Sequence, residues 1–330
     1  MATKELKFQS FDIEKKSAEC ISKLDEYVKH HFDALIDNFL DQFKQYCNKI
    51  VKMQETGKKD AIGFIHFSVL RTHIIAGNHN IRLDAYDGNW YMDRTECSGE
   101  YDASEYYIYL DEFAEALEES RKTSKGMIKP HDLQRAVFDE SEKYLVLIAE
   151  LIRAGLKKAS VEEWFKSIKR HELFVICIGE YQDKSDILYK EDTTIKDAKE
   201  VKRFLESKHQ PAYSHEICND LDLTCGRFQE SCFQFSSFDR SDLSGSSFEN
   251  SKIICSTFKQ AVLKQTDFDK AQIVNADFGG AVLEDVKFCG AQLNYVSFAG
   301  ASLTRVGFDG ALMAKGLDFS NAVLVDTVIP

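Results

Sequence analysis

The chain has 330 residues, with 42 lysines and arginines against 54 aspartates and glutamates and a formal net charge of −12. This length suggests about two domains, and 44% hydrophobic residues supply enough material for buried cores. The acidic balance argues against direct nucleic-acid binding of the basic-patch type. The sequence has no apolar run close to the roughly 20 residues of a membrane helix and no apolar signal core at its start. We therefore expect a cytoplasmic protein without membrane contact.

Residues 1–210 are predicted to form a mainly helical α+β domain with a small antiparallel sheet. Apolar residues recur at spacings of three and four over 12–55, which predicts a long amphipathic helix. The stretch 61–76 (AIGFIHFSVLRTHIIA) is apolar on nearly every side, which predicts a central buried helix. Residues 81–87 and 90–94 flank Gly88-Asn89 after Asp87 and predict a β-hairpin with an Asp-Gly turn.

The remaining elements of this domain are predicted from the same periodicities. Residues 173–178 (LFVICI) are typical of a buried strand, with 187–189 as its hairpin partner. Pro211 marks the expected domain boundary. Helices are expected at 104–122, 131–158, 161–170 and 194–207.

Histidines are the first candidates for chemistry in this domain. His66 and His73 share a face of the predicted helix 61–76, but seven residues place them about 10.5 Å apart. That separation is too large for two ligands of one ion, whose bonds are about 2.0–2.1 Å. We expect these two histidines and His79 to be buried and hydrogen-bonded. The nine cysteines form no C-x-x-C pair and are expected to be reduced thiols.

A pocket near the predicted hairpin is a second candidate. Its polar and aromatic residues are Arg71, Asp84, Asp87 and Trp90, although alternation on a half-exposed hairpin explains them equally well. Arg71 would need a carboxylate partner if buried, and Asp84 or Asp93 could supply it. The sequence contains no P-loop, G-x-G-x-x-G, H-E-x-x-H, G-x-S-x-G or zinc pattern. We therefore assign no catalytic residue, no metal and no cofactor.

The C-terminal third is organised by a period of five. A large apolar residue occupies every fifth position from Leu223 to Met313, nineteen times without a miss. A small residue stands two positions earlier in most repeats, and the pattern resumes at Phe319 after one inserted residue. A helix repeats at 3.6 and a flat strand at 2, so neither explains this spacing. A backbone that turns a corner every five residues does.

The same region carries an independent 20-residue register. Two sets of positions 20 apart are all phenylalanine and two are aliphatic, so each layer pairs opposed Phe rings with opposed aliphatic side chains. This pattern resembles the pentapeptide-repeat family, whose motif is small–x–Leu/Phe–x–x. The resemblance implies a right-handed four-sided β-solenoid over residues 215–330. About 22 repeats make five to six coils, which stack to about 26 Å at a β spacing of roughly 4.8 Å.

Outward positions of the predicted solenoid indicate where partners bind. One face carries no acidic residue among its outward positions and bears an apolar stripe, which marks contact with another surface. That surface is either the N-terminal domain, a second copy or a foreign protein. The docking residues on this face are predicted to be Phe235, Ile254, Val274 and Tyr295.

An acidic row on another face suggests a more specific partner. Members of the resembled family that protect DNA gyrase mimic duplex DNA with rows of carboxylates. Residues 215–330 contain 15 acidic and 9 basic residues, a net charge of −6, and the row is interrupted, so a solvated face is an equally valid interpretation. The candidate partner-binding residues are Glu249, Asp267, Asp269 and Asp309.

The sequence is thus interpreted as a non-enzymatic interaction or scaffold protein. Dimeric members of the resembled family pair through the C-terminal end of the solenoid, which implies a homodimer about Phe319, Leu324 and Ile329. Two alternatives remain open. One is protection of a DNA topoisomerase by mimicry, and the other is an enzymatic or small-molecule site in residues 1–210 with the solenoid as a dimerisation element.

Overall fold

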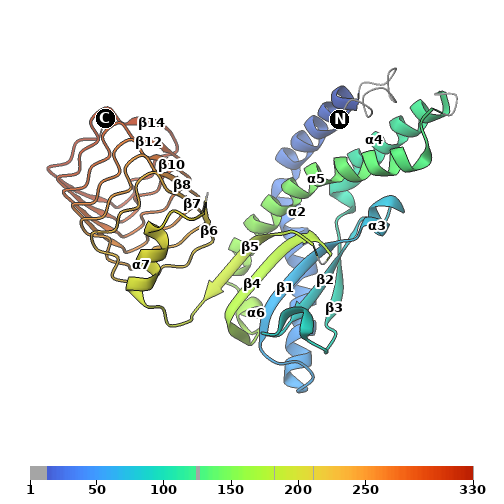
Figure 1. Ribbon diagram of the computed structural model, residues 1–330, viewed down its shortest axis with the longest axis horizontal. Helices are drawn as coiled ribbons and strands as arrows, with labels where there is room; N and C mark the ends of the chain where they lie inside the picture. The colour runs from blue at the N-terminus through green and yellow to red at the C-terminus, as the bar shows by residue number, and fades with distance from the viewer. Residues whose placement is uncertain (1–12, 124–126, 182, 211, 330) are drawn as a thin grey trace. The chain divides into compact units, whose positions relative to one another are not determined.

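The computed structural model describes residues 13–123, 127–181, 183–210 and 212–329. The chain divides into two compact units, the first ending at Asp192 and the second beginning at Thr193. Figure 1 shows helices with a sheet in the first unit and stacked strands in the second. No helix among the described residues is long and apolar enough to cross a membrane.

The first unit is built on a five-stranded sheet in the order β3-β2-β1-β4-β5. The outer pairs are antiparallel, whereas the central strands β1 and β4 run parallel. The sheet is therefore mixed rather than wholly antiparallel, although the α+β class is confirmed. Its strands are β1 (Ile62–Val69), β2 (Asn80–Tyr86), β3 (Ser98–Asp102), β4 (Arg170–Glu180) and β5 (Ser185–Asp192).

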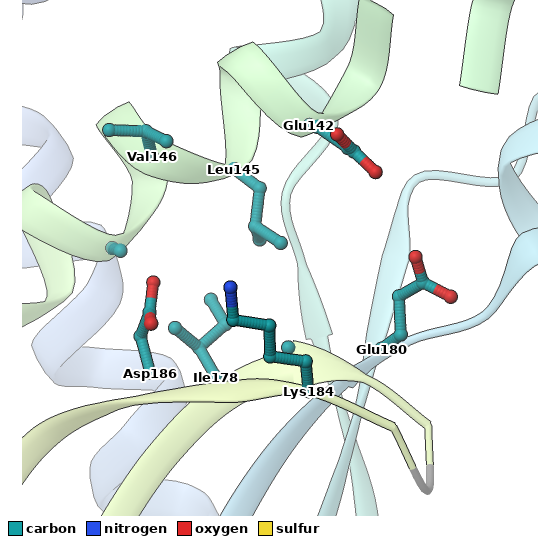
Figure 2. Close-up of a pocket in the computed structure, with 9 residues that line it drawn as sticks. Glu142, Leu145, Val146, Ile178, Glu180, Lys184 and Asp186 are labelled. Carbon is teal, nitrogen blue, oxygen red and sulfur yellow. The ribbon is translucent and has the colours of Figure 1, made fainter. Parts of the chain in front are cut away.

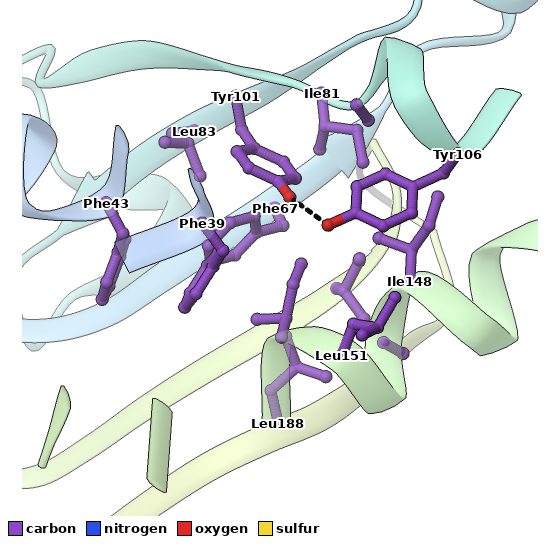
Figure 3. Packing of buried hydrophobic residues seen from close by; sticks show 14 of the residues in the cluster. Phe39, Phe43, Phe67, Ile81, Leu83, Tyr101, Tyr106, Ile148, Leu151 and Leu188 are labelled. Carbon is purple, nitrogen blue, oxygen red and sulfur yellow. Dashed lines mark hydrogen bonds between the residues drawn. The ribbon is translucent and has the colours of Figure 1, made fainter. Parts of the chain in front are cut away.

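Helices cover one face of this sheet. The predicted long helix is confirmed as α2 (Ile13–Glu55), and α4 and α5 match the expected positions closely. Aromatic rings from α2 and β1 meet in the core between these helices and the sheet, where Tyr101 also donates a hydrogen bond to the Tyr106 hydroxyl at 3.0 Å (Figure 3). The other helices are α3 (Arg71–Ile75), α4 (Ser104–Thr123), α5 (Pro130–Ala159) and α6 (Glu163–Lys166).

Three local predictions in this unit are wrong. Residues 61–76 form β1 and the short α3 instead of one helix, because a central strand buried on both faces has the same apolar composition as a buried helix. The strand β2 pairs with β3, and the 3-10 turn η1 (Trp90–Met92) replaces the second hairpin strand. The helix expected at 161–170 is only the four-residue α6, since β4 begins at Arg170.

The second unit is a parallel β-solenoid, as predicted. Its strands form a six-stranded sheet, β14-β12-β10-β8-β7-β6, and a four-stranded sheet, β15-β13-β11-β9, with partners 20 residues apart. The register shifts between β12 and β14, where the sequence has its inserted residue. The strands are β6 (Tyr213–Ser214), β7 (Cys232–Gln234), β8 (Lys252–Ile254), β9 (Val262–Lys264), β10 (Gln272–Val274), β11 (Val282–Glu284), β12 (Gln292–Asn294), β13 (Ser302–Thr304), β14 (Leu312–Lys315) and β15 (Val323–Val325).

Stacked phenylalanines fill the solenoid core. Rings one coil apart lie nearly parallel, as for Phe258 and Phe278, whose centroids are 4.8 Å apart at 7°. Rings on adjacent sides meet edge to face, as for Phe268 and Phe278 at 5.8 Å and 89°, a geometry favoured by the ring quadrupole. The helix α7 (Ala198–Glu206) belongs to this unit, because Leu205 lies in the same buried cluster and Lys202 donates to the Thr224 carbonyl oxygen at 2.5 Å.

Candidate functional site

The acid-free side of the solenoid is the six-stranded sheet, here called the β10 face. Ile254 and Val274 lie side by side on it, because β8 and β10 pair in register. Phe235 and Tyr295 lie at the adjoining corner in left-handed conformation, with φ of 51° and 54°. Three coils separate those two rings, about 14 Å at the inter-strand spacing. The four predicted docking residues therefore form two rows on one side of the solenoid.

The aromatic residues of the β10 face differ in their surroundings. Phe235 stacks on His215 with ring centroids 5.0 Å apart, whereas Tyr295 is 58% exposed. The charged outward residues of this face are Lys252 and Lys315. An exposed, mainly uncharged surface with two cations, in a chain of net charge −12, is suited to contact with a neutral or acidic partner surface.

The predicted acidic row has local structural roles. Asp269 accepts a hydrogen bond from the Cys289 N–H, and Asp267 accepts one from the Asp269 N–H, both at 2.8 Å. Glu249 lies 3.6 Å from the Lys270 ammonium group. These carboxylates therefore satisfy backbone donors or pair with lysine. Among the described residues, only Asp309 in the row forms no side-chain hydrogen bond or ion pair, so the negative potential of the row is weakened.

The last coil of the described chain exposes apolar side chains. Leu324 occupies an inward position but is 43% exposed, because no described segment packs over it. Phe319 stacks on Phe298 at 5.1 Å and is partly buried. Ile329 is also partly exposed. The three residues of the predicted dimer end thus lie in the final coil.

The pocket residues predicted near the hairpin do not converge. Arg71 is paired with Glu180 at 2.8 Å, not with either expected aspartate. Asp84 is instead held by Arg82 through two hydrogen bonds of 2.8 and 2.9 Å. Asp87 accepts from the Asn89 N–H, and Trp90 packs on Phe64 with centroids 3.9 Å apart. The four side chains are thus held by separate local contacts, because the predicted hairpin does not form.

Two open cavities adjoin the carboxyl ends of the parallel strands β1 and β4, the edge where open α/β sheets often bind ligands. One, of about 360 Å³, lies between α5 and β4–β5, and Figure 2 shows Lys184 projecting between Glu142 and Asp186 above Ile178. The other, of about 390 Å³, includes Arg71 and shares Glu180 with the first. Their acidic and basic side chains could contact a small charged molecule.

All three histidines are hydrogen-bonded as predicted, but only His66 is fully buried, whereas His73 and His79 are partly exposed. His73 and His79 hydrogen-bond to the Asn80 carbonyl oxygen and to Asp111, at 3.0 and 2.8 Å. His66 lies on β1, where its Nδ1 is 2.7 Å from the Ser68 hydroxyl and its buried Nε2 has no hydrogen-bond partner among the residues that the structure describes. Within the described parts of the chain, no three His, Cys, Asp or Glu side chains gather as a metal site.

A row of reactive side chains crosses the sheet at His66. In the strand register His66 pairs with Asp84 of β2 and with Cys177 of β4. All three point to the face opposite the helices and are 4% exposed or less. Burial lowers the pKa of His66 against the opposing effect of Asp84, and burial raises the pKa of the Cys177 thiol to about 12. Sequence analysis missed this row, since its members are far apart in sequence.

Family comparison bears on the second unit alone. Residues 256–285 and 281–313 match the model of the pentapeptide repeats. The C-terminal region is a pentapeptide-repeat solenoid. The N-terminal unit matches no family model, and no curated protein matches the chain.

Several solved pentapeptide-repeat structures resemble this solenoid. HetL from the cyanobacterium Nostoc, involved in heterocyst differentiation regulation, is 14% identical over 40% of this chain and 94% of its own, with a TM-score of 0.23. Rfr23 from the cyanobacterium Cyanothece is 18% identical over 38% of this chain and 99% of its own, with a TM-score of 0.24. QnrB1, a plasmid-mediated fluoroquinolone resistance protein, is 12% identical over 34% of this chain and 91% of its own, with a TM-score of 0.16.

Proposed function

We propose that this protein is a non-enzymatic interaction or scaffold protein that binds a protein partner through the β10 face of its pentapeptide-repeat solenoid. The observation that carries the proposal is the composition of that face, which presents the aligned Ile254 and Val274 with no outward acidic residue. The opposite sheet carries charged pairs, such as Arg305 with Asp285 at 2.7 Å. The β10 face, with two lysines and no acidic residue, is therefore depleted of charge relative to the opposite sheet, as the core of a protein interface is.

A pair of matched valines tests this proposal. Val274→Glu places a carboxylate on the β10 face, and Val282→Glu places one on the opposite sheet, each at an outward strand position. The full chain and both variants would serve as baits, with bound proteins identified by mass spectrometry and the binding of each measured with purified protein. We expect Val274→Glu to weaken binding at least tenfold and Val282→Glu to leave it unchanged. Equal binding by all three would refute the β10 face as the contact surface.

The C-terminal coil supports a second element of the proposal, a homodimer. Leu324 is 43% exposed at a position that is buried in every preceding coil of its column, and a second copy could cover it. Leu324→Asp should convert a dimeric mass in light scattering to a monomeric one, while the exposed Val282→Asp should not. A monomeric mass for the unaltered chain would contradict the dimer.

The cavity of Figure 2 favours one alternative, a small-molecule site in the first unit. Lys184 forms no ion pair among the described residues, and the apolar side chains of Leu145 from α5 and Ile178 from β4 line the cavity with Glu142. A screen of amino acids, amines and carboxylates by thermal shift would test it, with Lys184→Met as the variant. Shifts of the unaltered chain that vanish in Lys184→Met would favour this alternative.

A further inference from the structure

Residues 87–96 cover the sheet face that the helices leave open. The Trp90 ring packs on Phe64, and the Tyr91 ring lies 6.5 Å from His66 and 5.3 Å from Tyr86, measured between centroids. Because α2, α4 and α5 pack on the other face, this segment contributes directly to the burial of His66, which is only 1% exposed.

His66 under this cover is an imidazole held in its neutral form. Its Nε2 is buried without a partner among the described residues, so a proton added there would have no acceptor. Asp84 is the nearest carboxylate, but both of its oxygens accept hydrogen bonds from Arg82. The titratable or charged groups on the elements beside His66 are Asp84, Arg82 and Tyr86 on β2, Cys177 on β4 and Tyr91 on η1. Two further groups, Glu96 and Tyr181, contact Arg82.

The cover has one firm anchor and one strained part. Asp93 forms a buried ion pair with Lys59 at 2.5 Å and accepts hydrogen bonds at 2.8 Å from the N–H groups of Asp87 and Thr95. Trp90, by contrast, has a φ of +55°, a left-handed conformation that is rare for a bulky residue and is retained only where packing enforces it. Met92 beside it is 82% exposed. Asp93 is thus held by an ion pair and two hydrogen bonds, whereas the conformation of Trp90 depends on the packing of its ring.

We propose that residues 87–96 are a proton-released cover over the Cys177–His66–Asp84 row. In the open form water reaches Nε2, so the pKa of His66 returns toward 6.5, whereas burial lowers it in the closed form. His66 therefore binds a proton more tightly in the open form than in the closed form. The ratio of open to closed molecules rises by up to about tenfold for each pH unit below about 6.5. Above that pH the cover stays closed. Opening presents a thiol, an imidazole and a carboxylate side by side.

Trp90 is a natural reporter of this movement. The chain has two tryptophans, so Trp164→Phe leaves Trp90 as the single indole. In this variant we expect acrylamide quenching of Trp90 to rise as the pH falls from 7.5 to 4.5, in a transition that fits one proton, while far-UV circular dichroism is unchanged. Hydrogen exchange, corrected for the intrinsic rate at each pH, should show that the amides of residues 88–92 lose protection as the pH falls. The Thr95 amide should stay protected.

Substitution of His66 decides the assignment. His66→Gln, or His66→Phe if the first does not fold, should give quenching that no longer depends on pH. His171→Gln is the matched control, because the His171 ring also lies against the segment, within 2.9 Å of where a Gly88 Cβ would be, and it should retain the transition. A transition that survives in His66→Gln or disappears in His171→Gln, or quenching that is flat in Trp164→Phe itself, would overturn the proposal.

Discussion

The two units differ in the sequence separation between residues that are in contact. It is constant in the solenoid and irregular in the first unit. In the solenoid, Phe268 stacks on Phe248 and Phe288, each 20 residues away and each at 5.0 Å. In the first unit, His66 pairs with Asp84 on one side and with Cys177 on the other, 18 and 111 residues away. The first relation repeats and can be found in a sequence. The second occurs once and depends on the whole sheet.

The largest expected effect tests the repeated stacking. Phe268→Ala should destabilise the solenoid by about 3–5 kcal/mol, because the ring is fully buried between two others and the rigid coils cannot collapse into the cavity. Phe319→Ala is the matched control, since Phe319 stacks on Phe298 and is only partly buried. Denaturant unfolding followed by far-UV circular dichroism would measure both. Equal losses would mean that stacking from both sides does not matter.

The next effect tests a contact that occurs once, the Lys59–Asp93 ion pair. The side chains are 1% and 3% exposed. Lys59→Met leaves a buried carboxylate without its partner, and we expect the first unit to lose about 3–5 kcal/mol. Adding Asp93→Asn should restore part of the loss, since the uncompensated charge is gone. A double variant as unstable as Lys59→Met would contradict the electrostatic explanation.

The pH dependence of this pair has a definite sign. Burial alone would raise the pKa of Asp93, but hydrogen bonds from Lys59, Thr95 and Asp87 hold it below its ordinary value of 3.8. A carboxyl group with a lowered pKa in the folded state stabilises above its unfolded pKa and loses that contribution as the pH falls. The cost of Lys59→Met should therefore be full at pH 7 and should shrink below about pH 4.

The sequence predicted the solenoid well because each repeat independently indicates the same positions as inward-facing. Each coil repeats the assignment of the previous one, so Phe238, Phe258 and Phe278 support a single register. Residues 61–76 offered no such repetition. Ile65 and Phe67 face the helices, while Phe64 and His66 face the cover, so both faces are buried and the alternation that identifies a strand is lost.

The candidate sites follow the same division. The rows of the β10 face, including Ile254 beside Val274, could be located before any coordinates because outward positions recur at fixed spacing. The Cys177–His66–Asp84 row could not, since its members meet only through the parallel pairing of β1 with β4. The Glu180 partner of Arg71 was missed for the same reason.

A smaller effect distinguishes serines that share one repeat position. Ser241 donates a hydrogen bond to the Cys218 carbonyl oxygen at 2.6 Å and accepts one from the Leu221 N–H at 2.9 Å. Ser241→Ala should cost about 1–3 kcal/mol, because it removes both hydrogen bonds of this buried hydroxyl. The Ser251 hydroxyl is buried without a hydrogen-bond partner in the described part of the chain, so Ser251→Ala should be neutral or stabilising in the same unfolding measurement. Similar losses for the two variants would show that repeat position, not hydrogen bonding, determines the cost.

The smallest effect concerns the acidic row. Glu249 is 40% exposed beside Lys270, and Asp309 forms no side-chain hydrogen bond with any described residue. Glu249→Lys with Asp309→Lys should therefore change stability by no more than about 0.5 kcal/mol at each site. Because the fold is preserved, this double variant isolates the role of the row's charge. If the solenoid protects a topoisomerase by mimicking DNA, the variant should lose protection against a gyrase inhibitor in a supercoiling assay. Val282→Glu, on another face, should retain it. Protection that survives both charge reversals would show that Glu249 and Asp309 are not what such a partner recognises.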